Sequence, residues 1–132
     1  MQKFYTTGYS GKDVADLRRL LASIDAVLVD IRFSPTSELM KWRQVYLQTL
    51  LREKYHHVMQ LGNRAFRENK FMIQNVELGI KILTGLGANA VLFCSCEELK
   101  QCHRFVIMEE LRRRGFEVGE IENWKAAEAI LF

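Results

Sequence analysis

The segment Ala90-Val91-Leu92-Phe93-Cys94-Ser95-Cys96-Glu97-Glu98-Leu99-Lys100-Gln101-Cys102-His103-Arg104 gives the strongest indication of the fold. Its first four residues form a continuous apolar run, which is typical of a buried central strand. Phe105, Met108 and Leu111 then follow at helical spacing, up to Gly115. The segment therefore predicts a strand-to-helix junction that contains every cysteine of the chain. Such junctions often carry function, because strand carboxyl ends open onto a crevice and helix N-termini favour anions.

Strand-like and helix-like patterns alternate on both sides of this junction. The alternation predicts a single α/β domain over residues 1–132, with a mostly parallel sheet of about five strands and helices on both faces. The further strands are expected at 4–7, 26–30, 57–61 and 116–121. Four further helices are expected. Ser10 caps the first together with Asp13, and the second lies around Leu47, Leu50 and Leu51. Val76, Ile80 and Leu83 mark the third, which ends at Gly85 and Gly87, and a last short helix carries Trp124, Ala127 and Leu131.

The composition favours an ordered cytoplasmic protein. Hydrophobic residues make up 48% of the chain, which is enough for a core without disulfide bonds. We see no signal-like N-terminus and no apolar run as long as a membrane span, so we expect no membrane partner. Cysteines in the cytoplasm stay mostly reduced, so catalytic, redox and metal roles compete with a structural disulfide. The net charge of +3 permits an anionic partner without requiring one.

Polar side chains follow each expected strand. In a parallel sheet all these positions lie at the same edge, and such a mixture is costly to desolvate unless its members are paired or used in chemistry. Simpler roles compete at single positions: Asp30 and Arg32 form a structural ion pair, and Cys94 packs as a small core residue. The residues collected at this edge are Gly8, Tyr9 and Ser10, then Asp30, Arg32 and Ser34, then Asn63 and Arg64, and finally Cys94, Cys96, Glu97, Cys102, His103 and Arg104.

A thiolate enzyme is the leading functional interpretation, although the pattern does not establish catalysis. Cys94 or Cys102 would be the nucleophile, and a helix N-terminus at Cys102 would lower its thiol pKa. His103 would act as acid or base, and Asp30 completes the candidate catalytic set. Arginines suit a phosphate or nucleotide, so an anionic small molecule or nucleotide is the expected substrate. The candidate anion-binding residues are Arg32, Arg64, Arg104 and Ser10.

Other interpretations remain open. Glu97 and Glu98 follow the first cysteines and disfavour the anion-cradling loop of a cysteine phosphatase or sulfurtransferase. A metal-binding module is an alternative, but adjacent Cys102 and His103 should point in different directions, so we expect no metal and no cofactor. A nucleotide- or nucleic-acid-binding module without catalysis is the other alternative; nucleic acid is weakly supported, because the charge is low and no basic stripe contains aromatic residues. A disulfide among the cysteines also stays open.

The chain resembles the domain-of-unknown-function family 488 from about Thr6 to Ile121. The resemblance implies an α/β fold and a site at the matching residues, but no established reaction. Tyr9 departs from the family, because members often carry histidine at this position. At the position of Cys96 members carry either glutamate or cysteine, and here Glu97 follows the cysteine, so the position of a carboxylate differs. The matching motifs are Thr7-Gly8-Tyr9-Ser10, Asp30-Ile31-Arg32 followed by Pro35, Leu61-Gly62-Asn63-Arg64, Cys102-His103-Arg104, and Arg114-Gly115-Phe116-Glu117-Val118.

Overall fold

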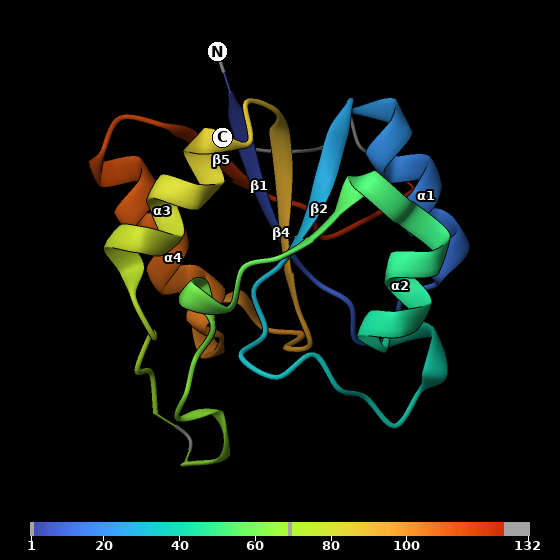
Figure 1. Ribbon diagram of the computed structural model, residues 1–132, viewed down its shortest axis with the longest axis horizontal. Helices are drawn as coiled ribbons and strands as arrows, with labels where there is room; N and C mark the ends of the chain where they lie inside the picture. Colours follow the sequence, from blue (N-terminus) through green and yellow to red (C-terminus); the bar gives the residue numbers. More distant parts are fainter. Residues whose placement is uncertain (1, 69, 126–132) are drawn as a thin grey trace.

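A five-stranded sheet forms the centre of the protein (Figure 1). The computed structural model describes residues 2–68 and 70–125. All neighbouring strands of the sheet are parallel, in the order β3-β2-β4-β1-β5, which confirms the predicted α/β fold with its parallel sheet. The strands are β1 (Lys3–Gly8), β2 (Ala26–Asp30), β3 (Tyr55–His57), β4 (Asn89–Cys94) and β5 (Glu117–Glu120).

Helices cover both faces of the sheet, as the alternating pattern predicts. α1 and α2 lie on one face, and α3 and α4 lie on the other (Figure 1). None of the described helices is both long enough and apolar enough to cross a membrane. The helices are α1 (Val14–Ser23), α2 (Gln44–Leu51), α3 (Val76–Gly85) and α4 (His103–Arg113), with short 3-10 turns at Met40–Trp42, Arg52–Lys54, Met59–Leu61, Phe66–Glu68 and Leu99–Gln101.

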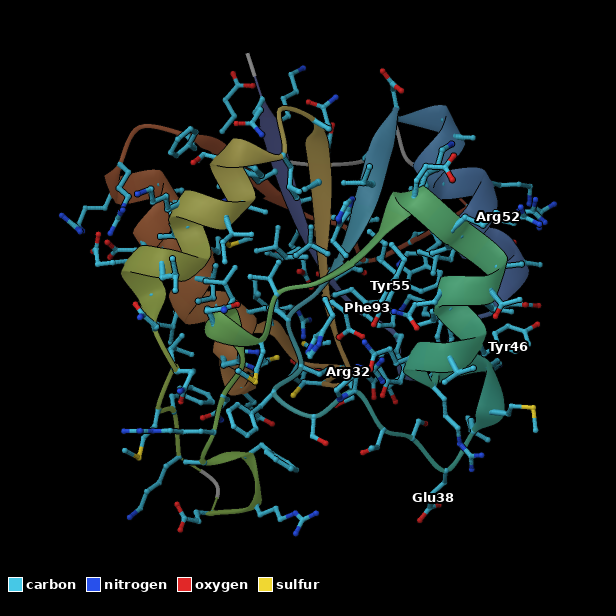
Figure 2. All side chains as sticks on the ribbon, viewed as in Figure 1. Arg32, Glu38, Tyr46, Arg52, Tyr55 and Phe93 are labelled. Carbon is cyan, nitrogen blue, oxygen red and sulfur yellow. The ribbon has the colours of Figure 1, made fainter. Side chains whose placement is uncertain are left out.

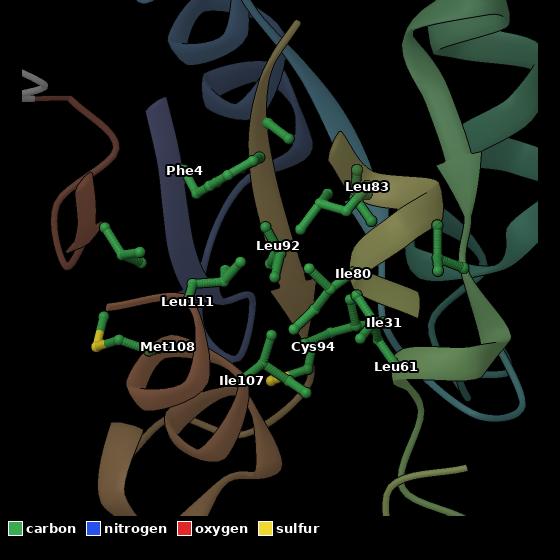
Figure 3. Close-up of a cluster of buried hydrophobic side chains, with 14 of the residues drawn as sticks. Phe4, Ile31, Leu61, Ile80, Leu83, Leu92, Cys94, Ile107, Met108 and Leu111 are labelled. Atoms are coloured by element: carbon green, nitrogen blue, oxygen red, sulfur yellow. The ribbon is translucent and has the colours of Figure 1, made fainter. Parts of the chain in front are cut away.

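The two faces bury separate hydrophobic clusters. Leu28 and Val91 of the sheet pack in one cluster with Leu17, Leu21 and Leu47 from α1 and α2. The other cluster lies between the sheet and α3 and α4, and its central strand residue is Leu92 (Figure 3). Because successive side chains of a strand point to opposite faces, β4 contributes to both clusters and is buried along nearly its whole length.

Two local expectations were wrong, and one lies outside the described residues. Asp13, rather than Ser10, caps α1, because its carboxylate accepts a hydrogen bond from the Ala15 N–H at 3.0 Å. The strand expected at 57–61 is found at Tyr55–His57, where it pairs with β2, and a 3-10 turn follows it. The expected last helix falls largely on residues 126–132, which are outside the described part of the chain.

The chain connections create a crevice at the carboxyl ends of β1, β2 and β4. After β1 and β2 the chain enters helices on one face, whereas after β4 it enters α4 on the opposite face. β4 lies between β1 and β2, so the connections diverge on either side of it. Ligand sites in parallel sheets form where neighbouring connections leave on opposite faces. The register places Gly8 beside Cys94, and Asp30 beside Phe93, at this edge.

Candidate functional site

The three cysteines of the chain converge at the carboxyl end of β4. Cys94 ends the strand, Cys96 lies in the loop after it, and Cys102 precedes the first turn of α4. Their Sγ atoms all lie within 4.8 Å of one another, and those of Cys94 and Cys102 are 2.6 Å apart. Cys94 and Cys102 are buried, whereas Cys96 is half-buried. The 3-10 turn at Leu99–Gln101 returns the chain to the strand end and so brings Cys102 back to the other two.

Arg104 fixes the loop that carries these cysteines. Its side chain is fully buried, and its guanidinium donates to the carbonyl oxygens of Cys96 at 2.8 Å and Glu97 at 3.2 Å, and to Cys94 Sγ at 3.3 Å. Two further N–H groups bind the carboxylate of Glu120. Burial alone would lower the pKa of Arg104, but the bond to Glu120 raises it above its usual value. Since all five donors are engaged, Arg104 positions the loop and has no free N–H for an anion.

Gly8 allows the cysteine loop to approach β1 closely. A Cβ at this position would lie 1.7 Å from the carbonyl oxygen of Cys96, so no side chain fits without moving the loop. The Tyr9 N–H also donates to the carbonyl of Cys94 at 2.9 Å. Glycine is therefore required here for close backbone contact, and not for an unusual backbone conformation.

His103 points toward the cysteine cluster. Its Nε2 lies 2.7 Å from the carbonyl oxygen of Ile31, and its Nδ1 lies 3.8 Å from Cys102 Sγ. Because a carbonyl only accepts, Nε2 carries the proton and Nδ1 presents its lone pair to the sulfur. Burial lowers the pKa of His103. The expected divergence of these adjacent side chains was wrong, because Cys102 has an extended backbone and His103 begins the helix.

The three thiols differ in acidity. Hydrogen bonds with Cys102 and Cys94 hold the pKa of the Cys96 thiol well below its usual range, and the nearby charge of Arg104 contributes. Burial is the main cause that raises the pKa of Cys94. At Cys102 the bond with Cys94 favours the thiolate, but the bond with Cys96 and burial outweigh it, so the pKa of Cys102 is raised. The structure thus differs from the expected acidic thiol at Cys102.

Asp30 and Arg32 form a buried, bidentate ion pair beside the cluster. Arg32 Nε lies 2.8 Å from Asp30 Oδ1, and Nη2 lies 2.6 Å from Oδ2. The hydroxyl of Tyr55 donates to Oδ2 at 2.5 Å. The guanidinium also lies over the rings of Tyr9 and Phe93, at 5.4 and 5.3 Å from their centroids. Arg32, Phe93 and Tyr55 are labelled in Figure 2. These contacts fix the orientation of Arg32, whose side chain lines the adjoining cavity.

A cavity of about 240 Å³ opens beside the ion pair and the cysteines. Asn63 shapes one wall: its Oδ1 accepts from the Ala65 and Met72 N–H groups, and its Nδ2 donates to the carbonyl of Lys70. None of the described residues that line the cavity is acidic, and two are cationic. The lining residues are Tyr9, Arg32, Phe33, Ser34, Thr36, Asn63, Phe66, Lys70, Phe71, Cys94, Ser95, Cys96, Gln101 and His103.

The structure gathers some of the predicted site residues and separates others. Arg32, Cys94 and His103 line the cavity. Asp30 lies directly behind Arg32, and Cys102 behind the other cysteines. Arg104 is turned toward the protein interior, and Ser10 and Arg64 are exposed positions outside the cavity lining.

Sequence reasoning missed several residues of this region. Glu120, the partner of Arg104, ends β5 and follows the same strand-end pattern as the residues that were identified. Lys70 enters the cavity wall through a loop held by Asn63, and Tyr55 reaches Asp30 from a neighbouring strand. No local signal in the sequence marks either of these contacts. No family model matches the chain, and neither a curated protein nor a solved structure matches it.

Proposed function

We propose that the protein is an enzyme that acts on a small anionic molecule, with the cysteine cluster as its reactive centre. The observation that carries the proposal is the cavity at the carboxyl edge of the sheet. Arg32, Lys70 and Cys96 line it, and none of its described lining residues is a carboxylate. Perturbed titratable groups that converge in a concave site favour function over a purely structural role. Membership of the domain-of-unknown-function family 488 stays a prediction beside this proposal.

Cys96 is the preferred reactive thiol. Of the three cysteines it alone is partly exposed, whereas Cys94 and Cys102 are shielded by the core. A nucleophile must reach its substrate as a thiolate, and the cationic surroundings of the cavity favour that form. The proposal thus moves the nucleophile from Cys94 or Cys102 to Cys96, and leaves Arg104 as the residue that positions the loop.

The anionic preference has a specific structural basis. Lys70 is exposed at the rim. Arg32 gives two of its five guanidinium N–H groups to Asp30 and two to the Tyr9 hydroxyl and the Thr36 carbonyl, which leaves one for a ligand in the cavity. Hydroxyl and amide groups from Ser34, Ser95 and other lining residues supply neutral donors. A phosphate or carboxylate group would therefore meet charge and hydrogen bonds together.

A competition between two alkylating reagents tests both parts of the proposal. Iodoacetate carries a negative charge and iodoacetamide does not, so the ratio of their rates reports the potential at the thiol. We expect mass spectrometry to find Cys96 modified first, with a ratio several-fold higher than for the neutral thiol 2-mercaptoethanol. Lys70→Gln should reduce this ratio, whereas Lys81→Gln, an exposed lysine on α3, should not.

Two results would contradict the proposal. Faster modification of Cys94 or Cys102 would reject Cys96 as the reactive thiol. A rate ratio equal to that of 2-mercaptoethanol would reject the anionic preference. Both reagents react with the thiolate of the same protein, so the ratio of their rates does not depend on the fraction of thiol that is deprotonated.

A further inference from the structure

We propose that Cys94, Cys96, Cys102 and His103 bind one Zn²⁺ ion at the floor of the cavity. The metal site shares Cys96 with the proposed reactive centre, so the anion preference of this thiol is measured on zinc-free protein. Single cysteines pack well as small core residues, but here two buried thiols and one half-buried thiol come together at one point. Their convergence therefore needs a chemical reason.

The distances fit a tetrahedral ion. Zinc binds sulfur at about 2.3 Å and nitrogen at about 2.0 Å, so its ligands lie about 3.8 Å apart for two sulfurs and about 3.6 Å for sulfur and nitrogen. The three Sγ atoms lie within 4.8 Å of one another. Nδ1 of His103 lies 3.8 Å from Cys102 Sγ but outside that group, so the imidazole must move toward the other two sulfurs to complete the tetrahedron. The pair Cys94 and Cys102, at 2.6 Å, must open by about 1 Å to accept the ion.

The hydrogen bond of His103 prepares it as a ligand. Metal-binding histidines usually donate their second ring N–H to a carboxylate or a backbone carbonyl, which fixes the tautomer and the ring orientation. Here Nε2 donates to the carbonyl of Ile31 at 2.7 Å, so the lone pair of Nδ1 faces Cys102. His103 as a whole is buried, with 7% of its surface exposed, which leaves the ring little freedom to turn away.

The charges around the cluster suit a metal thiolate centre. Three thiolates and one Zn²⁺ carry a net charge of −1, which would be costly in a buried site without compensation. The buried guanidinium of Arg104 donates to Cys94 Sγ at 3.3 Å and supplies a positive charge beside the centre. The same side chain holds the loop of Cys96 in place, so part of the site is organised before an ion arrives.

The donor set selects zinc. Thiolates with one imidazole in a tetrahedral arrangement favour Zn²⁺ over the hard cations Mg²⁺ and Ca²⁺, which prefer oxygen. Four protein ligands leave no open position for a catalytic water, so the ion would order the β4–α4 loop and keep Cys96 deprotonated.

Metal analysis of the full-length protein tests the site. Protein produced with zinc in the medium and purified without chelator should contain about one zinc per chain by elemental analysis. After removal of zinc, added Co²⁺ should occupy the same site. It should give thiolate-to-metal charge-transfer absorption together with the intense visible bands of tetrahedral cobalt. Cys96→Ser, at the half-buried position least prone to disturb folding, should weaken zinc binding by more than about 100-fold, since even changes beside a metal ligand cost 10- to 100-fold.

Matched variants separate ligation from structural effects. His103→Gln should change the visible cobalt bands, whereas His57→Gln should not, although His57 also binds a backbone carbonyl, that of Arg32, at 2.8 Å. Ser95→Ala, between two proposed ligands, should retain full zinc content. Absence of stoichiometric zinc together with an inability to bind Co²⁺, or a Cys94–Cys102 disulfide in freshly purified protein, would overturn the site. Unchanged cobalt bands in His103→Gln would remove His103 from it.

The two proposals fail in different ways. Failure of the protein to bind zinc or Co²⁺ would leave the iodoacetate preference of Cys96, measured on zinc-free protein, intact. Loss of that preference would leave the zinc content and the cobalt spectrum unchanged.

Discussion

Replacement of Gly8 by alanine should disrupt the cysteine loop more than any other single methyl group added to the sheet edge. The new Cβ would lie 1.7 Å from the carbonyl oxygen of Cys96, and ordinary contact begins at 3.4 Å, so the loop must move by about 1.7 Å. That shift would break the 2.8 Å bond from Arg104 to the same oxygen. Overpacking costs about 1–3 kcal/mol and a lost hydrogen bond to a charged group about 1.5–3 kcal/mol, so we expect a destabilisation of about 3 kcal/mol.

Urea unfolding of the Gly8→Ala variant measures this cost. With a denaturant dependence of about 2 kcal/mol per molar urea, the midpoint should fall by about 1.5 M. Gly85→Ala is the matched control, because a Cβ at Gly85, within α3, would meet no atom within 4 Å. That change should be neutral or stabilise by up to about 1 kcal/mol, through helix propensity. A midpoint for Gly8→Ala equal to that of the unmodified protein would refute the close contact between β1 and the cysteine loop.

Two buried polar contacts give the remaining predictions. Glu120→Gln removes the charge that faces the fully buried Arg104 and should lower the free energy of unfolding by about 2–3 kcal/mol. The control Glu109→Gln, in an exposed ion pair, should change it by less than about 0.5 kcal/mol. Equal effects of the two variants in urea unfolding would show that the stability of the protein does not depend on the pairing of Arg104 with Glu120. Tyr55→Phe removes the hydroxyl that donates to Asp30 at 2.5 Å and should lower the free energy of unfolding by about 1.5–3 kcal/mol in the same assay. An unchanged free energy would show that other donors satisfy the Asp30 carboxylate.

The sheet and its order of elements follow largely from local sequence signals. The apolar runs at 26–29 and 90–93 mark buried strands, because both faces of a parallel strand are covered by helices. Prediction failed where two local signals competed. Both Ser10 and Asp13 are good helix caps, and only the folded backbone shows that Asp13 accepts the bond from Ala15.

The position of β3 shows a different limit. The segment from 55 to 61 mixes apolar residues with His56, His57 and Gln60, so its pattern does not define where the strand begins and ends. Pairing with β2 decides this: Leu28 lies beside Tyr55, and Asp30 beside His57, and β2 ends there. Beyond this point the chain turns away at Met59, because no partner strand continues.

The candidate site also has one part that the sequence predicts and one part that it does not. The strand-end rule brings Asp30, Arg32 and Cys94 to one edge from sequence alone, because parallel strands end together. The rule does not say where a long side chain points. Arg104 turns inward because Glu120, two loop carbonyls and Cys94 Sγ satisfy its five donors.

The sequence by itself determined that this is an α/β protein with its cysteines at the end of a central strand, since hydrophobic periodicity and residue spacing are local properties. Only the tertiary structure decided that the sulfurs converge, that Nδ1 of His103 faces Cys102, and that Cys96 borders the cavity. These contacts depend on a 3-10 turn, an extended Cys102 and a buried arginine acting together. Side-chain direction is set by such non-local packing and hydrogen bonding, which no single stretch of sequence encodes.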